Sequence, residues 1–278
     1  MEIQCLLDDF NDIQASMEKK HWLRELGMTI YALHVPMKNK QEQSCTLAET
    51  NPLLRKENMN LIKKTIMLAD RLCEVVNPIV VIHAGGLIQE SETSGGVQIK
   101  KESFQNDLME LRKFIQERYP KIILAVENNP KVTEENKKEL VFRYGYEDDI
   151  AQWVKELRDP NIGTVLDTCH AIGVINYNKQ HYPRSEFVSI ESYLDAYAST
   201  LKLIHLSNGI NFVSKREEQG LPFLATNPED ITFVKGLFNF LNEIKYNHPI
   251  TIETEEADYD KALNFVETRK TIVESFRR

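Results

Sequence analysis

Short apolar runs alternate with amphipathic stretches along nearly the whole chain, and each run is followed by a polar turn. The runs occupy residues 3–7, 28–34, 79–83, 122–127, 162–167, 201–205 and 250–253. Stretches with helical periodicity lie between them, at residues 13–26, 53–75, 104–118, 150–158, 190–199 and 231–245. This alternation is typical of parallel strands joined by right-handed helical crossovers, so it predicts an α/β fold.

The number of these units favours a barrel. Seven strands and six crossovers in 278 residues suit a TIM (β/α) barrel, which takes about 250 residues, better than an open sheet. No Pro/Ser-rich linker or low-complexity tract divides the chain, so we expect a single domain over residues 1–278. An eighth strand is not evident in the pattern, and we expect the N-terminal strand-helix unit to be incomplete.

Composition narrows the classes of partner. The 34 Lys and Arg against 42 Asp and Glu leave a formal charge of -8, which makes nucleic acid an improbable main partner. No basic N-terminal region and no apolar stretch of about 20 residues is present, which predicts a cytoplasmic protein without membrane contact. The four cysteines form no C-x-x-C pair and are expected to be reduced, with Cys169 structural and its side chain directed away from Asp167.

Metal-ligand side chains stand at the ends of the apolar runs. They are His34, His83, Glu127, Asp167, His205 and Glu253, with His170 three residues after Asp167. In a barrel the carboxyl ends of the strands converge on one rim, where such enzymes place their active sites. We therefore expect these side chains to face one cavity.

One histidine at a strand end is more often a hydrogen-bonded structural residue than a ligand. Histidine is nevertheless enriched at the predicted strand ends, since three of the seven histidines close apolar runs. This enrichment favours a metal-binding role. Glu127, Asp167 and Glu253 each follow an apolar strand, where an unpaired buried charge is costly and a cation would offset the cost. Imidazole and carboxylate ligands favour zinc or manganese, with cobalt, iron and magnesium left open.

The segment Val165-Leu166-Asp167-Thr168-Cys169-His170 resembles the D-T-C-H signature of endonuclease IV and the D-x-x-H of sugar epimerases. Both belong to the xylose-isomerase-like TIM-barrel superfamily, which includes sugar phosphate isomerases/epimerases and AP endonuclease family 2. The epimerase branch implies one divalent ion held by Glu127, Asp167, His205 and Glu253. The endonuclease IV branch implies further metal ligands at His34, His83 and His170. Its Asp-x-His is missing from residues 214–220, so we expect no third ion.

The leading hypothesis is a divalent-metal-dependent sugar or sugar phosphate isomerase or epimerase acting through an enediolate. Glu127 and Glu253 would be its catalytic acid and base, and His170 would hold a substrate hydroxyl. The alternatives are an endonuclease IV-like phosphodiesterase on abasic DNA and a related carbohydrate dehydratase. A noncatalytic metabolite-binding barrel is the remaining hypothesis, disfavoured because it does not explain the costly charges.

Three long segments are expected to shape the substrate pocket as loops, at residues 84–102, 171–189 and 207–228. The middle one carries Tyr177, His181 and Arg184, which suit stacking on a sugar ring and contact with an anionic group. A solvated loop without function is the equally weighted alternative. A small carbohydrate or sugar phosphate is thus the expected partner, and homo-oligomerisation is left open.

Overall fold

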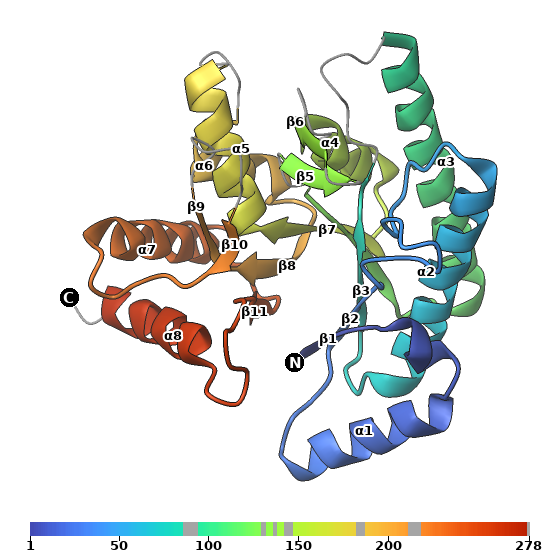
Figure 1. Ribbon diagram of the computed structural model, residues 1–278, viewed down its shortest axis with the longest axis horizontal. Coiled ribbons are helices and arrows are strands. Elements are labelled where there is room, and N and C mark those ends of the chain that lie inside the picture. The colour runs from blue at the N-terminus through green and yellow to red at the C-terminus, as the bar shows by residue number, and fades with distance from the viewer. Residues whose placement is uncertain are drawn as a thin grey trace. The chain divides into compact units, whose positions relative to one another are not determined.

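The computed structural model describes residues 1–85, 94–128, 132–135, 138–141, 147–181, 187–210 and 218–276. The chain divides into two compact units (Figure 1). The first unit comprises Met1–Asn129 and Tyr146–Val165, and the second comprises Pro130–Gly145 and Leu166–Arg278. The prediction of one domain over residues 1–278 stays a prediction.

The first unit is built on parallel strands that follow one another in chain order. They are β1 (Glu2–Gln4), β2 (Ala32–His34), β3 (Ile79–His83), β4 (Ile123–Glu127) and the first part of β7 (Ile162–Asp167). β3 and β4 pair in a register that sets His83 beside Glu127. The connections are the 3₁₀ helix η1 (Leu7–Phe10) and the helices α1 (Ile13–Glu25), α2 (Pro52–Leu72), α3 (Ser94–Arg118) and α4 (Glu147–Leu157).

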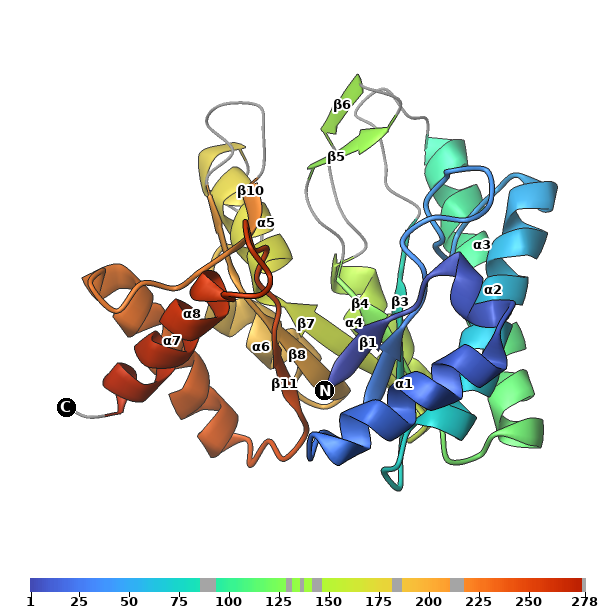
Figure 2. The same cartoon turned by 60° about the horizontal axis from the view of Figure 1, so that its bottom comes forward.

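Local sequence explains where α1 and α2 begin. The Asp12 side chain accepts a hydrogen bond from the Ala15 backbone N–H, and the Asn51 side chain accepts from Leu53 and Leu54. Pro52 occupies the first turn of α2, where its missing N–H costs no helical hydrogen bond. The apolar face of α2 packs on β2 and β3, and α2 runs beside α3 (Figure 2).

The second unit holds the end of β7 and two further parallel strands, β8 (Leu201–Leu206) and β11 (Ile250–Ile252). Two antiparallel pairs accompany them, β5 (Val132–Glu135) with β6 (Lys138–Val141), and β9 (Asn208–Ile210) with β10 (Glu218–Leu221). Its helices are α5 (Thr168–His181), α6 (Ile190–Tyr197), α7 (Pro228–Glu243) and α8 (Leu263–Ser275). α7 and α8 pack side by side (Figure 2).

Every predicted apolar run overlaps a parallel strand, but the ends differ. β1 stops at Gln4, and η1 occupies the end of the predicted run 3–7. The loop predictions need correction, because α3 begins at Ser94 inside 84–102 and α5 fills most of 171–189. The segment 207–228 contains β9 and β10. Gly95-Gly96 and the asparagines of α5 have low helix propensity, and for this reason the local sequence predicts loops where the structure has helices.

Among the described residues, no helix combines the length and the apolar character that crossing a membrane requires. The described residues contain seven parallel strands, and no eighth is found among them.

Candidate metal centre

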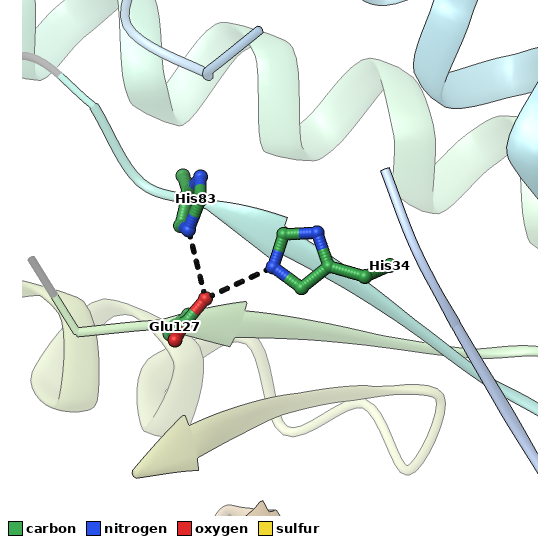
Figure 3. A group of neighbouring side chains, drawn as sticks. All are labelled: His34, His83 and Glu127. Carbon is green, nitrogen blue, oxygen red and sulfur yellow. Dashed lines mark hydrogen bonds and ion pairs between the residues drawn. The ribbon is translucent and has the colours of Figure 1, made fainter. Parts of the chain in front are cut away.

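In the first unit, two histidines point at one carboxylate oxygen (Figure 3). His34 Nε2 lies 3.2 Å from Glu127 Oε2, and His83 Nε2 lies 3.0 Å from the same atom. The three residues close β2, β3 and β4, so parallel pairing brings together side chains 93 positions apart. His34 and Glu127 are buried, with exposed fractions of 5% and 2%.

The second ring nitrogen of His34 indicates what this group binds. His34 Nδ1 lies 2.7 Å from the Val35 carbonyl oxygen, a contact in which the nitrogen must donate its proton. A neutral His34 then presents the lone pair of Nε2 to the Glu127 carboxylate. That contact is favourable only when a proton or a cation lies between the two atoms. Histidine ligands of metals usually donate their other N–H to a carbonyl or carboxylate in this way.

The end of β3 is held by a neighbouring segment. The Leu47 backbone N–H donates to the His83 carbonyl at 3.1 Å, and Thr46 forms a parallel bridge with His83. Gly85 follows at a φ of +65°, a left-handed conformation that favours glycine. A Cβ on Gly85 would lie 2.4 Å from Thr46 Cβ and 2.5 Å from the Leu47 carbonyl oxygen. The close approach that positions His83 therefore requires glycine.

Gly85→Ala should lower the free energy of unfolding by at least about 1–2 kcal/mol, because alanine resists this φ and its methyl group clashes with backbone. Gly236→Ala is the matched control, since Gly236 lies in α7 with nothing within 4 Å of its Cβ position. The control should raise stability by about 0.5–1 kcal/mol. Urea unfolding followed by circular dichroism measures both, and equal stability of Gly85→Ala and the parent would contradict the assignment.

In the second unit, two carboxylates lie near one imidazole nitrogen. His205 Nδ1 lies 2.8 Å from Glu253 Oε2 and 4.0 Å from Asp167 Oδ2. The ligand atoms of the three residues all lie within 4.8 Å of one another. Asp167 and His205 are buried at 3% and 1% exposure. The group therefore offers one nitrogen and two carboxylates to a single cation.

Asp167 also caps a helix, which orients its carboxylate. Asp167 Oδ1 accepts a hydrogen bond of 2.8 Å from the His170 backbone N–H in the first turn of α5. Oδ2 is left to face His205. Thr168 secures the same turn, because its hydroxyl donates to the Ser207 carbonyl at 2.6 Å and accepts from the Ser207 N–H at 3.1 Å.

Two expectations about these residues are wrong. The Glu253 side chain is 49% exposed, so the cost of a buried charge applies to Glu127 and Asp167 and not to Glu253. Cys169 does not point away from Asp167, since its sulfur lies within 4.8 Å of ligand atoms of Asp167 and His170. α5 begins at Thr168, so Cys169 lies in the first turn of this helix, directly after Asp167 and Thr168.

The ligand spacing of the His34, His83 and Glu127 group fits a divalent cation. Ligands about 2.0–2.2 Å from a metal lie about 3.0–3.5 Å from one another in tetrahedral or octahedral arrangements, and the His83–Glu127 and His34–Glu127 separations of 3.0 and 3.2 Å fall in this range. Imidazole with carboxylate suits zinc, manganese, iron and cobalt. The two groups are therefore candidate metal sites.

The model of the xylose isomerase-like TIM barrel family matches residues 3–272. The chain belongs to this family. Membership confirms the predicted fold class, and the parallel strands with intervening helices agree with it. Members of the xylose isomerase-like family bind divalent metals, which accords with the two residue groups above. A comparison with curated protein sequences found no match to this chain.

Solved structures with the same fold include both branches expected from the D-T-C-H segment. A D-tagatose 3-epimerase-like protein aligns over 99% of this xylose isomerase-like chain and 86% of its own, with a TM-score of 0.65 and 20% identity. A D-psicose 3-epimerase aligns over 99% and 87%, with a TM-score of 0.62 and 14% identity. Endonuclease IV from Thermus thermophilus aligns over 94% and 82%, with a TM-score of 0.56 and 16% identity.

The residues expected to contact substrate are placed only in part. His170 lies in the first turn of α5, buried at 8% exposure, beside Asp167 and Cys169. Tyr177 and His181 belong to the same helix. Arg184 lies outside the described residues, as does most of the segment 214–220 where an Asp-x-His was sought.

Proposed function

We propose that this protein is a divalent-metal-dependent isomerase or epimerase of a sugar or sugar phosphate. The observation that carries the proposal is the group in which His205 lies near Asp167 and Glu253 at the ends of parallel strands. The epimerases among the structural neighbours support it. A cytoplasmic location and the oligomeric state stay predictions from the sequence.

We assign Glu127, Asp167, His205 and Glu253 as the ligand set of the principal ion. Glu127 is included because the family resemblance implies four metal ligands, Glu, Asp, His and Glu, that follow successive strands in this order along the chain. Zinc or manganese suits this set best, with cobalt, iron and magnesium as further candidates. His34 and His83, sharing Glu127, would hold a second ion less tightly, because only three protein ligands are available there.

A divalent ion, when bound, would polarise the substrate carbonyl and stabilise the negative charge of the enediolate. The chain's residues carry the proton steps. Glu253, whose side chain is half exposed, would take a proton from the reacting carbon. Glu127 would return one to the opposite face, and His170 would hold a substrate hydroxyl. Tyr177, His181 and Arg184 would extend the substrate pocket.

One observation favours a second candidate function. His34 and His83 converge on Glu127 within 3.2 Å, and the one-metal epimerase pattern does not require them. A phosphodiesterase of the endonuclease IV type would use such a second ion, and a neighbour of that type shares the fold. The net charge of -8 weighs against a DNA substrate.

One experiment separates the two functions. Elemental analysis of the purified protein identifies the bound metal, and the protein is then assayed with that metal against ketoses, aldoses, their phosphates and abasic-site DNA. Interconversion of sugars without DNA cleavage is the expected result. Cleavage of abasic DNA without any change in the sugars would overturn the proposal in favour of the phosphodiesterase.

Sugar product formed in deuterated water should carry deuterium at the reacting carbon. The reason is that the proton delivered to carbon comes from the second carboxylate, Glu127, whose acidic proton equilibrates with solvent between turnovers, and not from the carbon that Glu253 deprotonates. NMR or mass spectrometry of the product measures the label, and unreacted substrate incubated without enzyme serves as the control. Unlabelled product would contradict exchange at these carboxylates.

A further inference from the structure

The segment between β2 and α2 is folded around two buried asparagines. Asn39 and Asn58 are 0% and 1% exposed, and Asn39 Nδ2 donates to Asn58 Oδ1 at 3.0 Å. Asn39 Oδ1 accepts hydrogen bonds from two backbone N–H groups of the segment. Asn58 Nδ2 donates to the carbonyl oxygens of Ser44 and Thr46 at 3.2 and 3.1 Å. A buried amide is costly unless such partners satisfy it, so this amide pair fixes one conformation of the segment.

A buried ion pair between α2 and α3 holds the end of the same segment. Arg55 Nε donates to Asp107 Oδ1 at 2.5 Å, and the Asp107 carboxylate also accepts a hydrogen bond from the Ala48 backbone N–H. Burial raises the pKa of Asp107 to about 6, and the hydrogen bond from Arg55 opposes this rise, so the carboxylate is mostly ionised at neutral pH. Ala48 has a φ of +57°, a left-handed conformation that alanine adopts only when its surroundings impose it.

Three consecutive residues of this segment each bind a different element of the first unit. Their contacts are Thr46 with Asn58 of α2, Leu47 with His83 of β3, and Ala48 with Asp107 of α3. The hydrogen bond to β3 is therefore flanked on both sides by a hydrogen bond to a helix. Loss of either helix contact would loosen the chain that holds the His83 carbonyl.

The imidazole of His83 depends on its backbone more than the imidazole of His34 does. The His34 ring is fixed by a hydrogen bond of its own, from Nδ1 to the Val35 carbonyl. His83 Nδ1 has no such bond among the described residues, while its Nε2 points at Glu127 (Figure 3). The direction of the His83 ring is thus set by packing and by the position of its backbone.

We propose that Asn58 and Asp107 are positioning residues that set the direction of the His83 imidazole at the second metal site. They are not ligands of the ion, and they act through the segment that binds the His83 carbonyl. The inference rests on the proposed function for the second ion, and it adds how the chain tunes the affinity of this site. Placement matters here because a site with three protein ligands has no spare ligand to replace a displaced imidazole.

Zinc titration of the metal-free protein by calorimetry tests this role, and the second ion is identified as the one that His83→Ala loses. Asp107→Asn keeps the shape of the side chain and removes its charge, so it should weaken the second ion by roughly tenfold or more and leave the principal ion unchanged. Asp159→Asn is the matched control, because Asp159 is also a buried carboxylate that accepts from an arginine Nε, that of Arg112, at 2.8 Å. Asp159 lies just before β7, at the amino ends of the strands, and its variant should keep both affinities.

Asn58→Asp keeps the proposal testable if Asp107→Asn does not fold. It retains the size of the side chain and removes both N–H donors, so it should weaken the same ion in the same way. Asn161→Asp is its matched control, since Asn161 Nδ2 likewise donates to two carbonyl oxygens, those of Pro120 and Ile122, at 2.7 and 2.8 Å. Far-ultraviolet circular dichroism checks the fold of each variant.

Hydrogen–deuterium exchange of the metal-free protein supplies a measurement that needs no ion. Peptides covering residues 44–48 and 80–84 should exchange faster in the two positioning variants than in the parent, and at the parent rate in the two controls. Equal affinity for the second ion in a folded positioning variant and its control would overturn the proposal, because faster exchange alone would then report a structural role. A parent that binds a single ion would overturn it as well. The titration uses no sugar, so a lack of sugar turnover in the parent would fail the proposed reaction alone.

Discussion

Glu253→Gln should keep the fold and lose nearly all sugar-isomerising activity, by roughly 10²–10⁴-fold in kcat. Glutamine still offers an oxygen to a cation but cannot accept a proton at neutral pH. The side chain is 49% exposed, so the substitution should change the free energy of unfolding by less than about 0.5 kcal/mol. Steady-state kinetics with the identified metal and sugar measure the loss.

Glu255→Gln is the control for this substitution. Glu255 is an exposed carboxylate two residues further along the same segment, and its backbone N–H is held by the Gly220 carbonyl at 2.8 Å. Its neutralisation changes the local charge equally and should leave turnover near the parent value. Near-normal turnover in Glu253→Gln would remove the acid–base role from that residue.

The double substitution His34→Ala and His83→Ala should remove one bound ion per chain and keep the principal one. Both imidazoles face Glu127 Oε2 within 3.2 Å, so their loss leaves that second position with a single protein ligand. A one-metal isomerase should then retain substantial sugar turnover, whereas a two-metal phosphodiesterase should lose its chemistry altogether. Metal analysis and both assays on the same preparation measure these outcomes.

His21→Ala is the matched control, because His21 is an exposed histidine of α1 whose contact is with Glu25 on the same helix. It should change neither metal content nor activity. Since His34 and Glu127 are buried, a second double variant, His34→Gln with His83→Gln, separates loss of ligands from loss of packing. Full metal content in the double alanine variant would contradict the second site.

Much of the barrel is readable from local pattern because each strand is a short apolar run and each helix has its own start signal. Asn51-Pro52 and Asn227-Pro228 pair a capping side chain with proline in the first turn, and these signals mark helix starts that periodicity places one to three residues late. α8 carries no side-chain cap at its N-terminus, which explains why the local pattern does not reveal it.

The candidate ligands were also predictable, because in parallel strands the residue that closes each run lies at the same edge of the sheet. His83 and Glu127 are paired in the register of β3 and β4. This agrees with the expectation that the polar residues that close two adjacent parallel strands lie side by side. The residue types at the strand ends can therefore be predicted from the sequence. It follows from strand period and chain direction, which are local properties.

Three features depended on tertiary structure. The shared approach of His34 and His83 to one oxygen of Glu127 arises from pairing across 93 residues. The exposure of Glu253 follows from the half-buried state of β11, which an apolar run does not reveal. The hydrogen bonds between the Thr168 hydroxyl and the Ser207 backbone, which secure the turn after Asp167, join residues 39 positions apart. The sequence by itself determined the strands, the helices and the ligand types, while long-range packing decided which of these side chains meet.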